Sequence, residues 1–250
     1  MKIILSPSKT QNHERKREEK GRAILKEDKT KELFEYLKSL SKEELKTELD
    51  IQGNLLDRTY QFYQEHSFDD QTLPAIECYN GAVFKQLDLE SYAEKEFSYL
   101  EENLIILSPM YGPLHSDTEI WPYRLEMSLK PNNINLYEYW QEEMKAYFAD
   151  VDLIINLASN EYSKVVEKNY QGKIIDFYFK EEKEDGSLKT IGYYVKQNRG
   201  KLLNKLIKNQ VNSLDKIKEI ELDGYKFNEK RSDQRKFMFI KPLDCIMNLN

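Results

Sequence analysis

Histidine and cysteine are scarce in this sequence, and their scarcity limits the chemistry that it can carry. Among 250 residues there are three histidines, His13, His66 and His115, and two cysteines, Cys78 and Cys245. The cysteines fit no metal-binding spacing, and the scattered histidines argue against a metal site or a histidine-based catalytic triad. The cysteine usage favours a reducing, cytoplasmic location. We therefore predict no bound metal.

Long apolar runs and cofactor motifs are lacking as well. No run approaches the roughly 20 apolar residues that span a bilayer, and the apolar core of the first ten residues is too short for a secretory signal. The sequence has no GxGxxG, P-loop, HExxH or GxSxG motif. We therefore predict no membrane partner, no bound dinucleotide or nucleoside triphosphate, and no cofactor.

Charged residues, in contrast, are abundant and unevenly placed. They make up 33% of the chain, and the net charge is −6. Residues 1–31 hold ten Lys and Arg against five acids, and residues 193–218 hold seven against one. Such asymmetry can focus a positive potential on one cleft while the remaining surface stays acidic. The alternative is that both segments are simply solvated faces of helices.

The pattern of apolar residues predicts one soluble α/β domain over residues 1–250, with a helical block inserted near the N-terminus. Residues 11–30 are polar and lack periodicity, which predicts a mobile loop. Runs rich in β-branched and aromatic residues predict strands at 2–5, 104–107, 153–157, 174–179, 191–195 and 237–240. Helical spacing predicts helices at 30–40, 41–49, 54–66, 74–87, 91–102, 136–149, 160–167, 200–209 and 213–219. Ser41 with Glu44 predicts a capping box for the second helix, and Ser159 is a predicted N-cap.

Small polar side chains follow three of the predicted strands. In open α/β sheets, ligands bind outside the carboxyl ends of the strands. If these strands lie side by side, their loops meet in one cleft, to which Arg124 and Arg199 can add positive charge. The alternative is that such residues only cap helices and form turns. The candidate cleft residues from these loops are Ser6, Lys9, Ser108, Tyr111, Asn156, Ser159, Asn160 and Tyr162.

The stretch 104–127 carries the densest set of aromatic and charged residues after a strand. We interpret it as one wall of the cleft, with Arg124 as an anion contact and Tyr111 as a stacking or hydrogen-bonding group. Glu126 is either an acid–base group or a structural ion-pair partner of Arg124. The pattern Ser6-Pro7-Ser8-Lys9 matches SxxK, but nucleophilic serine chemistry is a weak alternative because its partner motifs are missing.

Several motifs in this order make the chain resemble the YaaA family of bacterial cytoplasmic proteins, which is implicated in resistance to peroxide stress. Two of them, PYRLEM at 122–127 and INLASNEYSKVV at 155–166, are highly specific in combination. The others are ILSPSKT at 4–10, YNGAVF at 79–84, LSPMYG at 107–112, NLYEYW at 135–140, YYVKQNRGKL at 193–202 and DGYKFNE at 223–229.

The resemblance implies an α/β (α+β mixed) single-domain fold with a central mixed sheet, and a role in limiting oxidative DNA damage and free iron. It also implies binding of double-stranded DNA through a positively charged cleft with a helix-hairpin-helix element. We cannot place that element, because no GxG hairpin signature is present. The residues that match family positions are Ser6, Lys9, Tyr111, Gly112, Tyr123, Arg124, Asn156, Ser159, Tyr162, Arg199 and Gly200, and the basic positions near them are Lys196, Lys201, Lys205 and Lys208.

The chain also departs from the family pattern. Relatives commonly read FKGDVY where this chain has YNGAVF at 79–84, and Arg-Pro where it has His115-Ser116. Two functions are therefore carried forward. One is a peroxide-protective protein that binds duplex DNA. The other is an enzyme that acts on a nucleobase, nucleotide or other small phosphorylated metabolite in the same cleft. Direct iron binding is the weakest option, because ferrous sites favour histidines with carboxylates.

Overall fold

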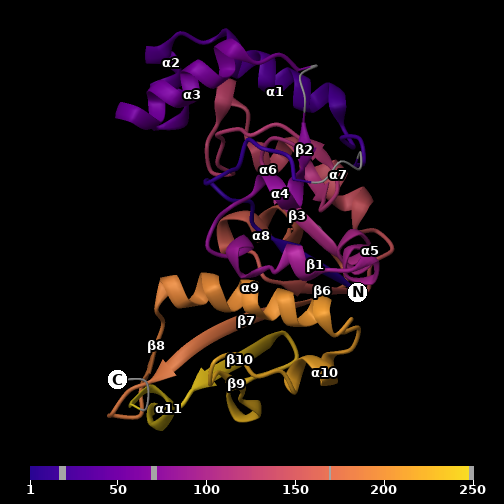
Figure 1. Ribbon diagram of the computed structural model, residues 1–250, viewed down its shortest axis with the longest axis vertical. Helices are drawn as coiled ribbons and strands as arrows, with labels where there is room; N and C mark the ends of the chain where they lie inside the picture. Colours follow the sequence, from indigo (N-terminus) through magenta and orange to yellow (C-terminus); the bar gives the residue numbers. More distant parts are fainter. Residues whose placement is uncertain (17–20, 69–71, 169, 248–250) are drawn as a thin grey trace.

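The fold is organised around one mixed sheet, seen in a computed structural model that describes residues 1–16, 21–68, 72–168 and 170–247 (Figure 1). Within these residues eight strands join the sheet in the order β4-β3-β1-β6-β7-β10-β9, with β8 paired to β7. The predicted α/β fold with a central mixed sheet is confirmed. The strands are β1 (Lys2–Leu5), β3 (Leu104–Ser108), β4 (Gly112–His115), β6 (Leu153–Asn156), β7 (Lys173–Glu182), β8 (Leu188–Lys189), β9 (Lys226–Phe227) and β10 (Lys236–Lys241).

The middle of the sheet consists of parallel strands, and the antiparallel strands lie at its margins. β3, β1, β6, β7 and β10 run parallel, whereas β4, β8 and β9 are antiparallel to their neighbours. β1 is apolar throughout its last three residues because both of its faces are covered, and these residues are fully buried. The flanking helices that contact these strands are α5 (Glu94–Asn103), α8 (Asn160–Glu167) and α9 (Gly192–Lys208).

The helical block predicted near the N-terminus forms a lobe above the sheet (Figure 1). It contains α1 (Glu27–Ser39), α2 (Lys42–Leu49) and α3 (Gly53–Glu65). The predicted capping box begins α2: the Ser41 hydroxyl accepts from the Glu44 amide, and the Glu44 carboxylate accepts from the Ser41 amide. The remaining elements are α4 (Ala75–Cys78), α6 (Leu136–Tyr139), α7 (Gln141–Tyr147), α10 (Leu214–Lys218), α11 (Leu243–Met247), the strand pair β2 (Leu73–Pro74) and β5 (Glu119–Ile120), and the 3₁₀ turns at 84–86, 89–91, 131–133 and 229–231.

Two sequence predictions of secondary structure are wrong, and a third, a helix, is present but interrupted. The predicted strand at 191–195 lies instead in the first turns of α9, because intrinsic propensity is weak against the packing of an apolar helix face. The predicted helix at 74–87 is reduced to α4 and a 3₁₀ turn, because Tyr79 and Asn80 pair with the backbone of the loop after β1. The helix at 136–149 breaks at Trp140, whose indole nitrogen donates to the Pro109 carbonyl at 2.8 Å.

In the charged segment 11–30, predicted as a mobile loop, the described residues are irregular up to Lys26 and helical from Glu27, and they are held by contacts to the rest of the protein. Residues 17–20 lie outside the described part of the chain. The anchor of the segment is the buried carboxylate of Glu119. Arg15 donates to both carboxylate oxygens at 2.5 Å, and the Gly21 amide and Thr72 hydroxyl donate at 2.7 and 2.8 Å. Burial by itself raises the pKa of Glu119, but these donors outweigh burial and hold the pKa below its usual value.

Because the folded-state pKa of Glu119 is lowered, the carboxylate adds stability that is present above its ordinary pKa and is lost as the pH falls through the lowered value. We therefore expect Glu119→Gln to be less stable than wild type at neutral pH and to lose less stability on acidification. Urea unfolding from about pH 7 to about pH 3 measures both effects. The control is Glu35→Gln on the exposed face of α1. Equal acid sensitivity of wild type and Glu119→Gln would contradict this role.

Among the described residues, no helix combines the length and the apolar character that crossing a bilayer requires.

Candidate functional site

The loops after β1, β3 and β6 lie together, as the strand-end reasoning predicts. β1 pairs in parallel with both β3 and β6, so the three carboxyl ends are neighbours. The Ser6 hydroxyl accepts from the Ser159 amide at 2.9 Å and lies 3.4 Å from the Ser159 hydroxyl. Ser159 is the N-cap residue of α8 by position, although its side chain caps no amide. The Gln11 side-chain oxygen accepts from the Tyr123 amide at 2.6 Å, which joins the first loop to the PYRLEM segment.

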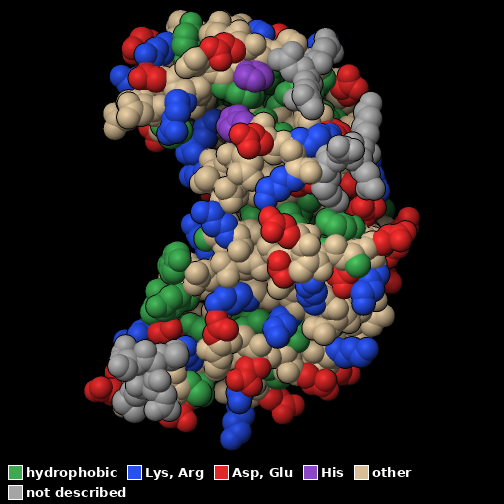
Figure 2. Space-filling model, viewed as in Figure 1, with side chains coloured by type: hydrophobic (Ala, Val, Ile, Leu, Met, Phe, Trp, Pro, Cys, Tyr) green, Lys and Arg blue, Asp and Glu red, His purple; other side chains and the backbone are tan. Residues whose placement is uncertain are grey.

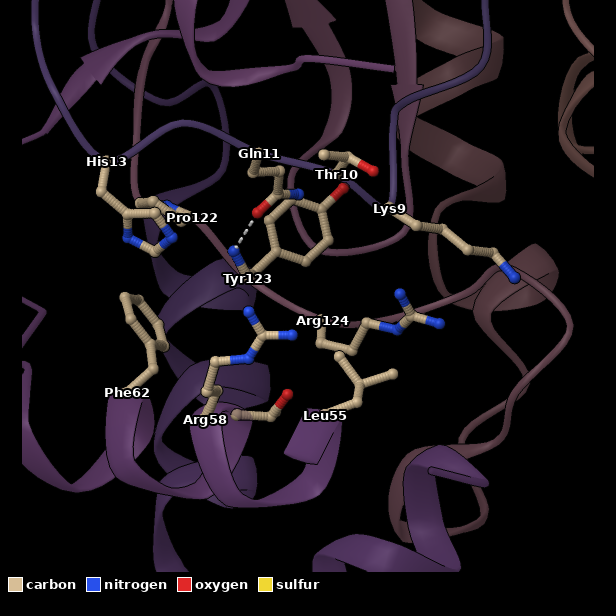
Figure 3. A pocket seen from close by; sticks show the side chains of 11 residues that line it. Lys9, Thr10, Gln11, His13, Leu55, Arg58, Phe62, Pro122, Tyr123 and Arg124 are labelled. Carbon is tan, nitrogen blue, oxygen red and sulfur yellow. Dashed lines mark hydrogen bonds between the residues drawn. The ribbon is translucent and has the colours of Figure 1, made fainter. Parts of the chain in front are cut away.

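Beside these loops is a hollow of about 360 Å³ that we call the basic hollow. One wall is the chain from Lys9 to His13, the opposite wall is α3, and Pro122–Arg124 lies between them (Figure 3). Among the residues that the structure describes, the lining contains three cations and one histidine but no carboxylate. The full lining is Lys9, Thr10, Gln11, His13, Leu55, Arg58, Thr59, Phe62, Pro122, Tyr123 and Arg124.

Glu126 forms ion pairs with two of these cations. One of its carboxylate oxygens lies 2.5 Å from the Lys9 ammonium, and the other accepts from Arg124 at 2.9 Å. Of the two sequence interpretations of Glu126, the structure therefore supports the ion-pair partner. The Arg124 side chain is only 17% exposed, and its buried Nε has no hydrogen-bond partner among the described residues. Ser6 faces Ser159 while Lys9 faces Glu126, so the SxxK pattern forms no serine–lysine pair.

The α3 wall supplies residues that sequence reasoning missed. The exposed Arg58 donates from Nε to the Asn54 carbonyl at 3.3 Å, and its guanidinium points into the hollow between Phe62 and Arg124 (Figure 3). Phe62 meets His13 edge to face, with 6.2 Å between ring centroids. The helix was predicted, but nothing in its apolar spacing indicates that Arg58 faces Arg124. The segments are far apart in sequence and meet only in the tertiary structure.

Other predicted cleft residues are part of the core. Tyr111 is 1% exposed, and its hydroxyl donates to the Trp121 carbonyl and accepts from the Trp121 amide. Tyr111, predicted as a stacking or hydrogen-bonding group of the cleft, is therefore a core residue whose hydroxyl is bonded within the protein. Gly112 has φ +71°, and a Cβ there would lie 2.6 Å from the Trp140 ring, so the position requires glycine for packing. Tyr162 is also buried, and burial raises the pKa of its hydroxyl.

Tyr123 combines a core contact with a place in the basic hollow. Its ring is 7% exposed and its hydroxyl lies between the Ser108 and Tyr79 hydroxyls, at 2.9 and 3.0 Å. Burial raises the pKa of this phenol well above its usual value. Tyr123 therefore shapes the hollow and positions Arg124, and its hydroxyl is already bonded within the protein.

Asn156 and Arg199 line a second, smaller hollow of about 170 Å³ at the carboxyl end of β6. The Asn156 amide donates to Asp176 at 2.7 Å, and its oxygen accepts from the Ala158 amide. Burial lowers the pKa of Arg199, and the nearby Asp176 carboxylate opposes that shift. The predicted residues thus divide between two hollows, with the Ser6–Ser159 contact as a link between their loops.

The predicted basic helix does not line the basic hollow. Lys201 forms an ion pair with Asp223, and Lys208 donates to the Ser91 carbonyl and hydroxyl while it lies over the Tyr92 ring at 4.8 Å. Lys196 and Lys205 are exposed on α9. Gly200 is buried in mid-helix, where α9 touches the backbone at Val83.

The molecular surface is concave on one side, between the helical lobe and the lower part of the sheet (Figure 2). Lys and Arg side chains gather along this concave side in the view shown. The N-terminal end of α9, which carries the exposed Tyr193 and Tyr194, lies on the same side below it (Figure 1). Within the described residues, no three His, Cys, Asp or Glu side chains group as they would to bind a metal ion.

Comparison with known proteins identifies the family. The family model described as "Peroxide stress protein YaaA" matches residues 1–231. The chain belongs to the YaaA family. A UPF0246 protein of Fusobacterium nucleatum is 39% identical over 248 residues, covering 96% of this chain and 99% of that protein. A UPF0246 protein of Finegoldia magna is 35% identical over 246 residues, covering 97% and 99%. The YaaA assignment agrees with the resemblance seen in the motifs.

Membership extends beyond these two relatives. A UPF0246 protein of Desulfitobacterium hafniense is 34% identical over 249 residues, covering 97% of this chain and 99% of that protein. Because the matched segments extend over nearly all of this YaaA chain, they include both the basic hollow and the smaller hollow lined by Asn156 and Arg199.

Proposed function

We propose that this YaaA family member acts in the cytoplasm against peroxide stress by binding double-stranded DNA through the basic hollow. The observation that carries the proposal is the grouping of Lys9, Arg58 and Arg124 around one open hollow, where the single carboxylate of Glu126 pairs with two of the three cations and leaves a net positive charge. Phosphate oxygens are the ligands that such a cluster of cations favours, and phosphate contacts supply most of the sequence-independent affinity for DNA.

The position of the cations supports an extended polyanion as the partner. Lys9 and Arg58 come from two facing walls, and Arg124 comes from the segment between them (Figure 3). The net charge of −6 means that the rest of the surface repels DNA, so a locally positive hollow also sets the orientation of the encounter. Limitation of oxidative DNA damage and of free iron follows from this role and stays a prediction.

As the candidate for the helix-hairpin-helix implied by the family resemblance, we propose the pair α9 and α10. These helices are joined by five residues, 209–213, and Gln210 has φ +47°, the conformation that a hairpin glycine usually supplies. This pair lies at the end of α9 away from Tyr193 and Tyr194 (Figure 1). It therefore offers a second contact to the DNA backbone, separate from the basic hollow.

The salt dependence of duplex binding tests the proposal. We expect the affinity for a short fluorescent duplex, measured by anisotropy, to fall linearly on a log–log plot against salt, with a slope near −3 if three phosphates are contacted at about −0.9 each. Arg58→Ala should make the slope shallower by about 1. Lys145→Ala, which removes an exposed lysine of α7, is the control and should leave the slope unchanged. Duplex affinity that is absent, or equal at low and physiological salt, would refute DNA binding.

The alternative is an enzyme that acts on a nucleotide or another small phosphorylated metabolite in the same hollow. Its volume of about 360 Å³ is suitable for a small ligand, and the Phe62 ring beside Arg58 could hold a base while the cations hold a phosphate. Competition distinguishes the two. A nucleoside monophosphate that displaces the duplex at micromolar concentration favours the metabolite, and one that competes only at salt-like millimolar concentration favours DNA.

A further inference from the structure

A larger cavity, of about 910 Å³, lies below α9 and has no residue in common with the basic hollow. It is enclosed by α9, by the end of β7 with β8, and by the chain at 223–225 and 241–246. We call it the Lys241 cavity. Its lining includes two mostly buried polar side chains, Asn198 and Lys241, whose nitrogen atoms form no ion pair and no hydrogen bond of normal geometry with the described residues.

The first is Asn198, which is 2% exposed and whose Nδ2 has no hydrogen-bond partner. The Asn198 amide lies close to the Tyr225 hydroxyl and affects the pKa of that hydroxyl. Burial and the hydrogen bond to Glu181 raise the pKa of Tyr225, and Asn198 lowers it by a smaller amount. Even so, the amide makes no hydrogen bond of normal geometry. An unsatisfied buried donor is costly, and few are found in native proteins.

The second is Lys241, which is 8% exposed and forms no ion pair with a described carboxylate. Its ammonium lies 5.8 Å from the centre of the Tyr225 ring. The side chain is mostly buried, but its ammonium stays open to the cavity, where it pairs with no described carboxylate and can meet a bound anion.

Glu181 is the carboxylate expected to pair with Lys241, because the two residues are directly opposite on the parallel strands β7 and β10. Both oxygens of Glu181 are already engaged. The Tyr225 hydroxyl donates to one at 2.8 Å, and the Lys189 ammonium lies 3.1 Å from the other. The remaining charges of the lining, Lys201 and Asp223, pair with each other. The Lys241 cavity is therefore left with one uncompensated positive charge and one spare amide donor.

We propose that the Lys241 cavity binds a small organic anion whose carboxylate or phosphate oxygens accept from the Lys241 ammonium and the Asn198 amide. An oxyanion supplies both of the missing partners at once, since it carries the opposite charge and several acceptor oxygens. Ile191, Tyr194 and Ile246 give the same cavity an apolar side for the body of the ligand. The volume exceeds that of a bare inorganic ion and is suitable for a metabolite.

Calorimetric titration of the full chain tests the proposal with three probes: inorganic phosphate, adenosine monophosphate and succinate. We expect at least one to bind wild type, and Lys241→Met to weaken that binding at least tenfold. Phosphate or the nucleotide alone identifies a phosphate site, and succinate alone identifies a carboxylate site. The matched control is Lys226→Met on the neighbouring strand β9, where the lysine is 61% exposed and paired with Glu221, and it should bind as wild type does.

Binding at the basic hollow is separated from this result by a second readout. Arg58→Ala should leave the affinity for the probe unchanged, and Lys241→Met should leave duplex binding unchanged. Urea unfolding checks the fold of Lys241→Met, which keeps an unbranched side chain of similar length and should unfold near the wild-type midpoint. Asn198→Ser, which shortens the side chain of the second donor, should also weaken binding of the probe. If none of the three probes binds wild type, or if Lys241→Met and Asn198→Ser both bind as wild type does, the proposal is wrong.

Discussion

Gly200→Ala should lower the free energy of unfolding by about 2 kcal/mol, within the range found for overpacking in a well-packed core. A Cβ at this position would lie 2.2 Å from the Val83 carbonyl oxygen and 2.8 Å from the Gln86 side chain. The nearest atom belongs to the backbone and cannot rotate away. The helix would have to move from the 3₁₀ turn at 84–86 against which it packs, and this cost exceeds the roughly 1 kcal/mol that alanine normally adds in a helix.

The matched control for Gly200→Ala is in the same helix. Gly192 is the first residue of α9, and a Cβ there would meet no atom within 4 Å. Gly192→Ala should therefore be neutral or slightly stabilising, because it only reduces the freedom of the unfolded chain. Urea unfolding of both variants makes the comparison. If Gly200→Ala were as stable as Gly192→Ala, the close approach of α9 to Val83 would not exist in solution.

This prediction also reassigns a residue that the family resemblance placed in the DNA cleft. Gly200 is buried against the chain at Val83, away from the lining of the basic hollow. We therefore expect the folded fraction of Gly200→Ala to bind duplex DNA with wild-type affinity. A selective loss of DNA affinity, with unchanged stability, would restore the original interpretation.

The double variant Lys9→Ala/Arg58→Ala should reduce duplex affinity on the order of 50-fold in about 0.1 M salt. Each phosphate contact releases about 0.9 counterion, which amounts to nearly tenfold in affinity at this salt concentration, and two contacts are removed. The two residues come from opposite walls of the basic hollow and both are exposed, so their loss leaves the core intact. Fluorescence anisotropy at matched ionic strength measures the effect.

A control with the same change in net charge decides how this loss is explained. Lys145→Ala/Lys226→Ala removes two exposed lysines that lie outside the basic hollow. It should reduce affinity by less than about threefold, because charges farther than about 10 Å from the bound phosphates are largely screened. Equal losses in the two double variants would mean that DNA responds to net charge and that the basic hollow has no special role.

The strands of the parallel core were predictable because burial on both faces makes them continuous apolar runs. β1 was predicted to the residue, and β3 and β6 nearly so. The capping box at Ser41 and the boundaries of α8 were predicted because the residues that determine them are adjacent in the chain. The predicted strand at 191–195 failed because its aromatic and β-branched residues belong to the first turns of a helix whose later turns are held by the core.

The candidate site was only partly predictable, and for a different reason. Strand adjacency could be anticipated, so the meeting of the Ser6 and Ser159 loops was expected, and Lys9 and Arg124 were both identified. The direction in which each side chain points could not be anticipated. Tyr111 and Arg124 come from the same loop, yet Tyr111 turns inward to Trp121 while Arg124 lines the basic hollow. Sequence spacing does not distinguish these directions.

By itself, the sequence determined the family, the α/β class, the parallel core strands and the loops that gather at their carboxyl ends. These features depend on local composition, on short motifs and on the side-chain period of a buried strand. Only the tertiary structure decided that Arg58 of α3 faces Arg124 and that Glu126 forms an ion pair with Lys9. It also decided that Lys241 lies opposite Glu181, whose carboxylate already has other partners. The physical reason is that each of these arrangements joins segments distant in the chain, and their contacts arise only when the sheet and its helices pack together.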